Sequence, residues 1–175
     1  MTRAMVVFES MFGSTEAVAR AVAEGLSTGM QVQVASVTAA PAEVGSDIGL
    51  LVVGGPTHAL GMSRASTRAD AVKQGALPTG GPEVGLRDWI ARLSHGSSIV
   101  PAVTFDTRVK KRGLPGSAAR TAQKQLRRRG FPIAAPARSF YVGGTPGPLV
   151  DGELQRAREW GAQLAANLTR TGATI

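Results

Sequence analysis

The chain has 175 residues, 43% of them apolar, and a net charge of +8, so one globular domain with a sizeable core is expected over residues 1–175. It has no cysteine, which excludes disulfides, zinc–thiolate sites, iron–sulfur clusters and a thiol nucleophile, and two histidines are too few for a histidine-rich metal site. No apolar run approaches the roughly 20 residues that span a bilayer, and the start turns acidic too soon for a signal peptide, so we expect a cytoplasmic protein without a membrane span.

Short apolar runs predict five strands. Continuous runs of this kind are typical of strands that are buried on both faces of a parallel sheet. The second run instead alternates, with Val32, Val34 and Val37 as its strongest positions. Pro101 lies in the fourth run and cannot donate a ladder hydrogen bond, so the start of that strand is the least defined. The predicted strands are residues 4–8, 30–37, 50–53, 99–105 and 139–142.

Helical patterns lie between these runs. Apolar residues recur every three or four positions after residue 15, at residues 86–93, at residues 117–129 and after residue 151. Alternating strands and helices predict an α/β fold with a parallel sheet and helices on both faces. Residues 56–82 form a long stretch rich in Gly, Ser, Thr and Pro, with one short helical turn near residues 68–73. A connection of this length is usually functional or mobile.

The loop after the first strand has the features of a phosphate site. Ser10, Ser14 and Thr15 offer hydroxyl donors, and Gly13 lets the backbone turn close to a ligand. The helix that follows provides unpaired N–H groups and the positive end of its dipole, so a phosphate is held there without a basic side chain. The alternative is an ordinary strand–helix turn with a Ser or Thr cap. The loop consists of Ser10, Met11, Phe12, Gly13, Ser14 and Thr15.

This loop resembles the flavodoxin phosphate loop, Thr/Ser-x-Thr-Gly-x-Thr. Ser10, Gly13 and Thr15 match it, and Phe12 replaces a hydroxyl, as in the flavodoxin modules of flavodiiron proteins and in WrbA-type quinone reductases. Residues 54–62 (Gly-Gly-Pro-Thr-His-Ala-Leu-Gly-Met) are similar to the Gly-x-Pro-Thr loop with which those families approach the flavin ring. The resemblance covers nearly the whole chain. It implies a flavodoxin-like doubly wound five-stranded parallel sheet of order 2-1-3-4-5, with FMN as the cofactor.

The resemblance also implies which residues contact the flavin. The phosphate would lie on the loop at residues 10–15, and the ring would lie against two further loops. His58 is alternatively a surface histidine, and Phe105 is alternatively a core residue at a strand end. No catalytic residue and no metal ligand is expected. The residues expected at the ring are Pro56, Thr57, His58, Ala59, Leu60, Phe105, Asp106 and Thr107.

One segment carries the whole excess of positive charge. Between residues 105 and 130 there are nine basic residues and one acidic residue, which gives +8, whereas basic and acidic residues balance elsewhere. If residues 108–112 surround the flavin, they favour its anionic forms and raise its potential. The alternative, strongest for residues 127–129, is a solvated helix face. The basic residues are Arg108, Lys110, Lys111, Arg112, Arg120, Lys124, Arg127, Arg128 and Arg129.

Three functions agree with these features. The first is FMN-dependent electron transfer with a redox partner that has an acidic surface. The second is an NAD(P)H-dependent quinone (or related) reductase, in which residues 56–82 form a substrate lid. The third is a flavin-free binding module that uses the basic region 108–129, although nucleic acid is disfavoured because aromatic residues do not alternate with the charges. The sequence leaves the redox partner and the oligomeric state open.

Overall fold

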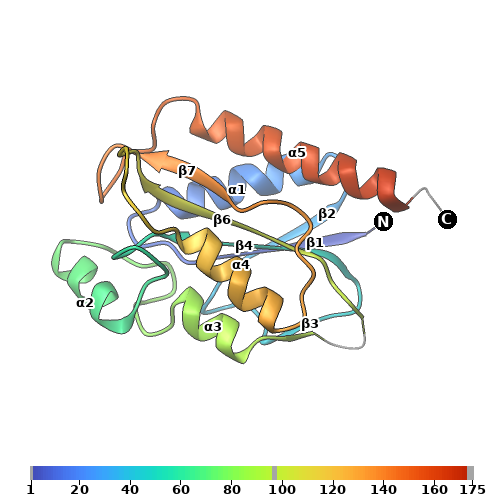
Figure 1. Ribbon diagram of the computed structural model, residues 1–175, viewed down its shortest axis with the longest axis horizontal. Helices are drawn as coiled ribbons and strands as arrows, with labels where there is room; N and C mark the ends of the chain where they lie inside the picture. The colour runs from blue at the N-terminus through green and yellow to red at the C-terminus, as the bar shows by residue number, and fades with distance from the viewer. Residues whose placement is uncertain (1, 96–97, 173–175) are drawn as a thin grey trace.

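The computed structural model describes residues 2–95 and 98–172, and it has a five-stranded parallel sheet at its centre (Figure 1). The strand order is β2-β1-β4-β6-β7. The strands β3 (Glu43–Val44) and β5 (Ser94–His95) pair separately as a small second sheet. Without these two, the order is the predicted 2-1-3-4-5, which confirms the doubly wound fold. The main strands are β1 (Arg3–Phe8), β2 (Gln31–Ser36), β4 (Ile48–Pro56), β6 (Ala102–Val109) and β7 (Arg138–Val142).

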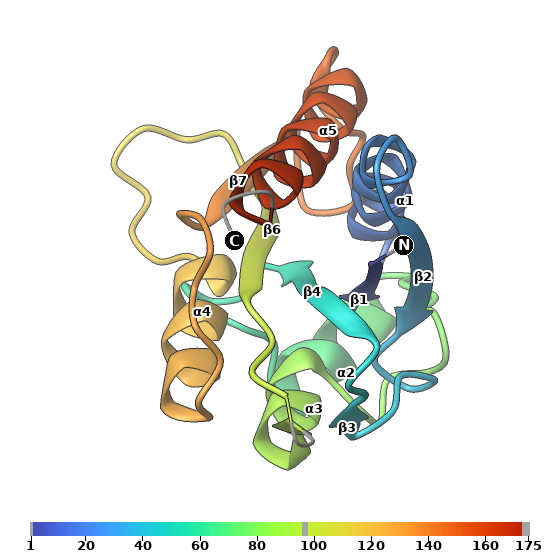
Figure 2. The same ribbon diagram turned by 90° about the vertical axis from the view of Figure 1, so that its right-hand side faces the viewer.

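Helices cover both faces of the sheet. In the end-on view, α1 (Ser14–Leu26) and α5 (Glu153–Gly172) lie on one face, and α3 (Leu86–Arg92) and α4 (Ala118–Arg128) lie on the other (Figure 2). The remaining helix, α2 (Ala65–Lys73), lies at the edge toward which the strands point (Figure 1). Within the described part of the chain, no helix is both long enough and apolar enough to cross a membrane.

Successive residues of the central strands pack into two separate cores. Val52 faces the core beneath α1 and α5, and its neighbours Leu51 and Val53 face the core beneath α3 and α4. This alternation follows from the period of two in a strand, and it explains why the central runs are continuously apolar. Gly161 allows α5 to lie directly against α1, because a Cβ there would be 2.2 Å from the carbonyl oxygen of Val22.

The fourth predicted strand is shifted along the chain. It was expected at residues 99–105, whereas β6 begins at Ala102 and continues to Val109. Ile99 is 75% exposed, and Pro101 cannot donate to the ladder, so pairing begins after it. Residues 105–107 therefore lie inside a paired strand and not in a loop after it.

The segment 56–82 also differs from expectation. It holds a helix of nine residues, α2, where one short turn near residues 68–73 was predicted. The first turn of α2 has no aliphatic periodicity in sequence, and only Arg68 and Ala71 of this helix are buried. Polar contacts, described below, fix it to the body of the protein.

Candidate functional site

A narrow cleft lies where the main strands end. Its volume is about 60 Å³, and it is bounded by the last residues of β4, β6 and β7 and by residues that follow β1, β4 and β7. Ligands of doubly wound sheets bind at this edge, between the first strand and its neighbour across the switch in strand order. The structure brings together eight of the residues expected from the sequence: Met11, Phe12, Ser14, Thr15, Pro56, Thr57, His58 and Thr107. It also places Arg108 there, which the sequence analysis considered as one of the basic residues around the flavin, and it adds three residues that sequence reasoning missed: Val109, Val142 and Thr145.

The loop after β1 presents main-chain donors to this cleft. Among the described residues, the N–H groups of residues 11–15 have no hydrogen-bond partner in the protein. The next two N–H groups are paired, Glu16 with the Ser10 hydroxyl at 3.2 Å and Ala17 with the Gly13 carbonyl at 3.0 Å. Five consecutive free donors at a helix start form a cradle for an anion, which the dipole of α1 also favours. The donor set therefore fits a phosphate group.

Gly13 gives the loop its shape. Its φ of +99° is in the left-handed region, which residues with a Cβ rarely adopt. A Cβ at this position would meet no atom within 4 Å, so the backbone angle and not crowding requires glycine. The Ser10 and Thr15 side chains are buried within the loop, and the Thr15 hydroxyl lies 2.7 Å from the Thr107 hydroxyl on β6. Of the predicted hydroxyl donors, only that of Ser14 makes no side-chain hydrogen bond among the described residues.

A tight turn forms one wall of the cleft. His58 and Gly61 exchange two main-chain hydrogen bonds of 2.8 and 2.9 Å. The two residues between them, Ala59 and Leu60, have φ of 42° and 77°, a conformation that costs non-glycine residues roughly 1–2 kcal/mol each. Strain of this kind concentrates at ligand sites. Ala59 and Leu60 do not line the cleft itself but an adjoining cavity, which His58 shares.

The side chain of His58 is neutral at pH 7. Burial lowers its pKa below the ordinary value, and the nearby positive charge of Arg68 lowers this pKa further. Its Nδ1 lies 3.2 Å from the Thr67 hydroxyl on α2. His58 is thus half-buried between α2 and the cleft and not a fully exposed loop residue.

Phe105 and Asp106 lie beneath the cleft. Phe105 is fully buried, and its ring packs edge-on against Phe140 and Trp160, so it belongs to the core. Asp106 is also fully buried. Its Oδ2 accepts hydrogen bonds from the hydroxyl of Ser117 at 2.6 Å and the N–H of Ala119 at 3.1 Å.

The third donor to Asp106 connects it with the cleft. The Thr57 hydroxyl donates to Asp106 Oδ2 at 3.1 Å and accepts from the N–H of Ala118 at 3.0 Å. Asp106 therefore fixes Thr57, a cleft residue, against the first turn of α4. It acts through Thr57 and is not itself among the lining residues.

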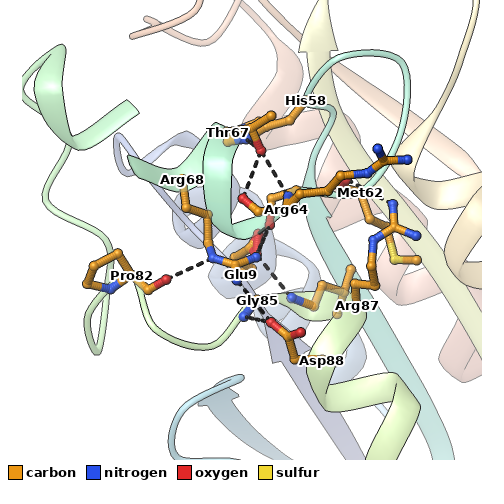
Figure 3. Close-up of polar contacts among 12 residues, drawn as sticks. Glu9, His58, Met62, Arg64, Thr67, Arg68, Pro82, Gly85, Arg87 and Asp88 are labelled. Carbon is orange, nitrogen blue, oxygen red and sulfur yellow. Dashed lines mark hydrogen bonds and ion pairs between the residues drawn. The ribbon is translucent and has the colours of Figure 1, made fainter. Parts of the chain in front are cut away.

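A buried polar cluster anchors the long segment between β4 and α3 (Figure 3). Glu9 follows β1, and both of its carboxylate oxygens accept from the Ser63 hydroxyl, at 2.5 and 2.6 Å. The N–H of Leu86 donates to the same carboxylate at 3.0 Å. The buried Arg68 donates to the Ser63 hydroxyl at 3.0 Å and forms an ion pair of 3.0 Å with Asp88. Sequence reasoning missed this cluster.

The charge of Glu9 has opposing influences. Burial raises its pKa above the ordinary value, whereas the bonds from Ser63 and the N–H of Leu86 and the charge of Arg68 lower it. Burial is the largest of these effects. One signal in the sequence could have indicated this cluster. Glu9 directly follows a buried strand, and a buried carboxylate requires hydrogen-bond or ion-pair partners elsewhere in the fold.

The same segment covers the outside of the phosphate loop. The N–H of Thr79 donates to the Ser10 carbonyl at 3.1 Å, and its hydroxyl donates to Glu16 at 2.8 Å. Met11 packs in a small apolar cluster with Ala71 and Ala76. Residues 57–85 are therefore a fixed wall of the site in this structure, held at both ends by hydrogen bonds.

The basic residues after β6 lie beside the cleft. Arg108 lines it, and the segment that follows projects from the body beyond α4 (Figure 2). Lys110 lies over the Tyr141 ring at 5.8 Å, and Arg108 donates to the Leu114 carbonyl at 2.7 Å. Lys110, Lys111 and Arg112 line a neighbouring hollow with Arg108 and Tyr141, and we call residues 108–112 the positive rim.

Solved structures of the same fold agree with this architecture. An archaeal flavodoxin matches with a TM-score of 0.63 and 18% identity, over 96% of this chain and 99% of that one. A WrbA-like flavodoxin from Agrobacterium tumefaciens matches with a TM-score of 0.58 and 18% identity, over 97% and 99% of the two chains. The flavodiiron protein from Giardia intestinalis matches with a TM-score of 0.61 and 18% identity, over 97% of this chain and 37% of that one. No family model matches the chain, and no curated protein matches it in sequence.

Proposed function

The chain has a flavodoxin-like fold, and we propose that it binds FMN in the cleft at residues 10–15 and transfers electrons through it. The observation that carries the proposal is the row of free main-chain N–H groups at residues 11–15, directly before the first turn of α1. Two flavodoxin structures match this chain over 96% and 95% of its length. The free N–H groups suit a phosphate dianion.

The roles of the lining residues follow from their positions. The loop at residues 10–15 would hold the phosphate, with the Ser14 hydroxyl as an added donor. The cleft of about 60 Å³ has room for a phosphate and not for a three-ring flavin, so the ring would lie at the cleft mouth. There the turn His58–Gly61 and the aliphatic side chains of Val109 and Val142 would cover apolar ring area.

FMN supplies the redox chemistry when bound, and the protein sets its position and electrostatics. The positive rim at residues 108–112 would stabilise added negative charge, and it would attract a partner protein with an acidic surface. His58 is neutral at pH 7 because its pKa is lowered by burial, so it adds no charge beside the ring.

A second candidate is an NAD(P)H-dependent reductase that uses a quinone or a related acceptor. The strained turn at Ala59 and Leu60 favours the reductase. This turn packs next to α2 and would form one side of a substrate site beside the flavin. The two functions share the FMN site and differ in the electron donor.

The test begins with a titration of FMN into the purified protein, followed by flavin fluorescence and absorption. We expect saturable binding of one FMN, and bleaching of the flavin bands by dithionite. Oxidation of NADH or NADPH with a quinone, measured at steady state, then separates the reductase from an electron carrier that needs a protein partner. Absence of saturable binding would contradict both functions.

A further inference from the structure

A second and larger cavity lies behind the turn at residues 58–61. Its volume is about 410 Å³, compared with about 60 Å³ for the flavin cleft. It is bounded by this turn, the first turn of α2, one residue of α3 and one residue of α4. Of its lining residues, only His58 also lines the flavin cleft, so the two hollows are separated by the turn.

Two arginines without acidic partners line this cavity. Arg64 precedes α2 and Arg87 belongs to α3, and no acidic residue is among the lining. Within residues 2–95 and 98–172, neither guanidinium forms an ion pair, whereas the neighbouring Arg68 is paired with Asp88. Figure 3 shows the Arg64 and Arg87 side chains extending to the same side of the cluster, past Met62. Two guanidinium groups on one cavity without a carboxylate make it positively charged, which favours an anionic ligand.

The Arg87 guanidinium is partly desolvated and fixed in position. One terminal nitrogen donates to the Met62 carbonyl at 3.2 Å. Its Nε is buried and has no hydrogen-bond partner among the described residues. A buried donor without a partner costs roughly 1–3 kcal/mol.

Further donors surround the same space. The hydroxyl of Ser66 lines the cavity and makes no hydrogen bond within the described part of the chain, whereas that of Thr67 bonds to the Arg64 carbonyl at 3.0 Å. Both residues are in the first turn of α2, whose free N–H groups add positive potential. The lining also includes two large apolar residues, the buried Met62 and the 54% exposed Leu60.

We infer that this cavity binds an organic phosphomonoester. A phosphate dianion matches two guanidinium groups, each of which presents a fork of donors suited to phosphate oxygens. The cavity of about 410 Å³ is larger than a phosphate group needs, and its lining includes the apolar Leu60 and Met62, so the ligand carries an organic group next to its phosphate. The site is separate from the phosphate cradle at residues 10–15, and its occupancy does not depend on flavin binding.

Isothermal titration calorimetry with phenyl phosphate tests this site directly. The wild-type chain, without FMN and saturated with FMN, is compared with the double variant Arg64→Gln/Arg87→Gln. Arg92→Gln, an exposed arginine at the end of α3, is the matched control. We expect saturable binding to wild type and control, at least tenfold weaker in the double variant, with each single variant weaker by about threefold or more. Urea unfolding verifies that all variants are folded.

The controls separate this site from the flavin site and from other anions. Inorganic phosphate and benzoate are expected to bind at least tenfold more weakly than phenyl phosphate, because each lacks one half of the ligand. Equal affinity for either would contradict a phosphomonoester site, and so would an unchanged affinity in the double variant or no saturable binding to wild type. Loss of FMN binding alone, with arginine-dependent binding of phenyl phosphate retained, would overturn the flavin proposal and leave this one standing.

Discussion

Replacement of Asp106 by alanine should destabilise the fold strongly, although this residue does not line the cleft. Its Oδ2 is the acceptor for three donors, the hydroxyls of Thr57 and Ser117 and the N–H of Ala119. A hydrogen bond to a charged group contributes about 1.5 kcal/mol at the low end of its range. Three such bonds amount to about 4.5 kcal/mol. The Oδ1 atom is buried without a partner, so removal of the carboxylate also relieves part of its desolvation cost, and we expect a net loss of about 3 kcal/mol.

Urea unfolding followed by circular dichroism measures this loss. With a slope of about 2 kcal/mol/M, the midpoint should fall by about 1.5 M. Asp47→Ala is the matched control, because Asp47 is 58% exposed and its ion pair with Arg3 is worth less than about 1 kcal/mol. Asp106→Asn, which keeps the shape and one acceptor, should lie between the two. If Asp106→Ala unfolds at the same urea concentration as Asp47→Ala, the assignment of Asp106 as the anchor of Thr57 and α4 is refuted.

Three further predictions concern packing, pH and charge. Gly161→Ala should cost about 1–3 kcal/mol in unfolding free energy, because its Cβ would be 2.2 Å from the Val22 carbonyl oxygen. Gly29→Ala, with its nearest contact at 3.4 Å, should be nearly neutral, and equal urea midpoints for the two variants would contradict the close α1–α5 contact. The pKa of Glu9 is raised in the folded protein, so folding favours the neutral carboxyl. This contribution to the free energy of unfolding is full below the ordinary pKa of 4.5 and is lost as the pH rises through the higher pKa of the folded state. Wild type should therefore lose stability relative to Glu9→Gln as the pH rises from about 4 to 8, and a constant difference between their midpoints would refute this. Neutralisation of the four basic residues in the range 108–112 should lower the midpoint potential of bound flavin by about 10–30 mV, because each charge at roughly 10 Å contributes a fraction of a kcal/mol. A redox titration measures this shift, and an unchanged potential would exclude the electrostatic role of these residues.

The sequence predicted the sheet because its signals are local. Each continuous apolar run marks a strand whose two faces are both covered, and Val52 and Val53 in the third run do pack into different cores. The order of the strands came from the resemblance of the first loop to a known family and not from the runs themselves. The fourth strand was misplaced because the apolar run 99–105 includes Pro101 and an exposed Ile99. Hydrophobicity alone does not show where ladder pairing begins.

The positions of some cleft residues were also predicted, because they depend on local signals in the sequence. Loops that directly follow strands were placed correctly at the strand ends, as for Ser14 and Thr57. Contacts between residues far apart in the chain left no local pattern, and the link from Glu9 to Ser63 spans 54 positions. Such partners are identified only once the fold brings them together, so the anchoring of residues 57–85 and the arginines of the second cavity were not predicted.

The preference for FMN over riboflavin tests the central proposal most directly, because the two ligands differ only in the phosphate. Both are titrated into the same preparation, with flavin fluorescence as the readout. Five free N–H groups and the dipole of α1 should together favour the phosphate by at least about 3 kcal/mol, so FMN should bind at least about a hundredfold more tightly than riboflavin. Equal affinities for the two, or binding of neither, would contradict a phosphate site at residues 10–15.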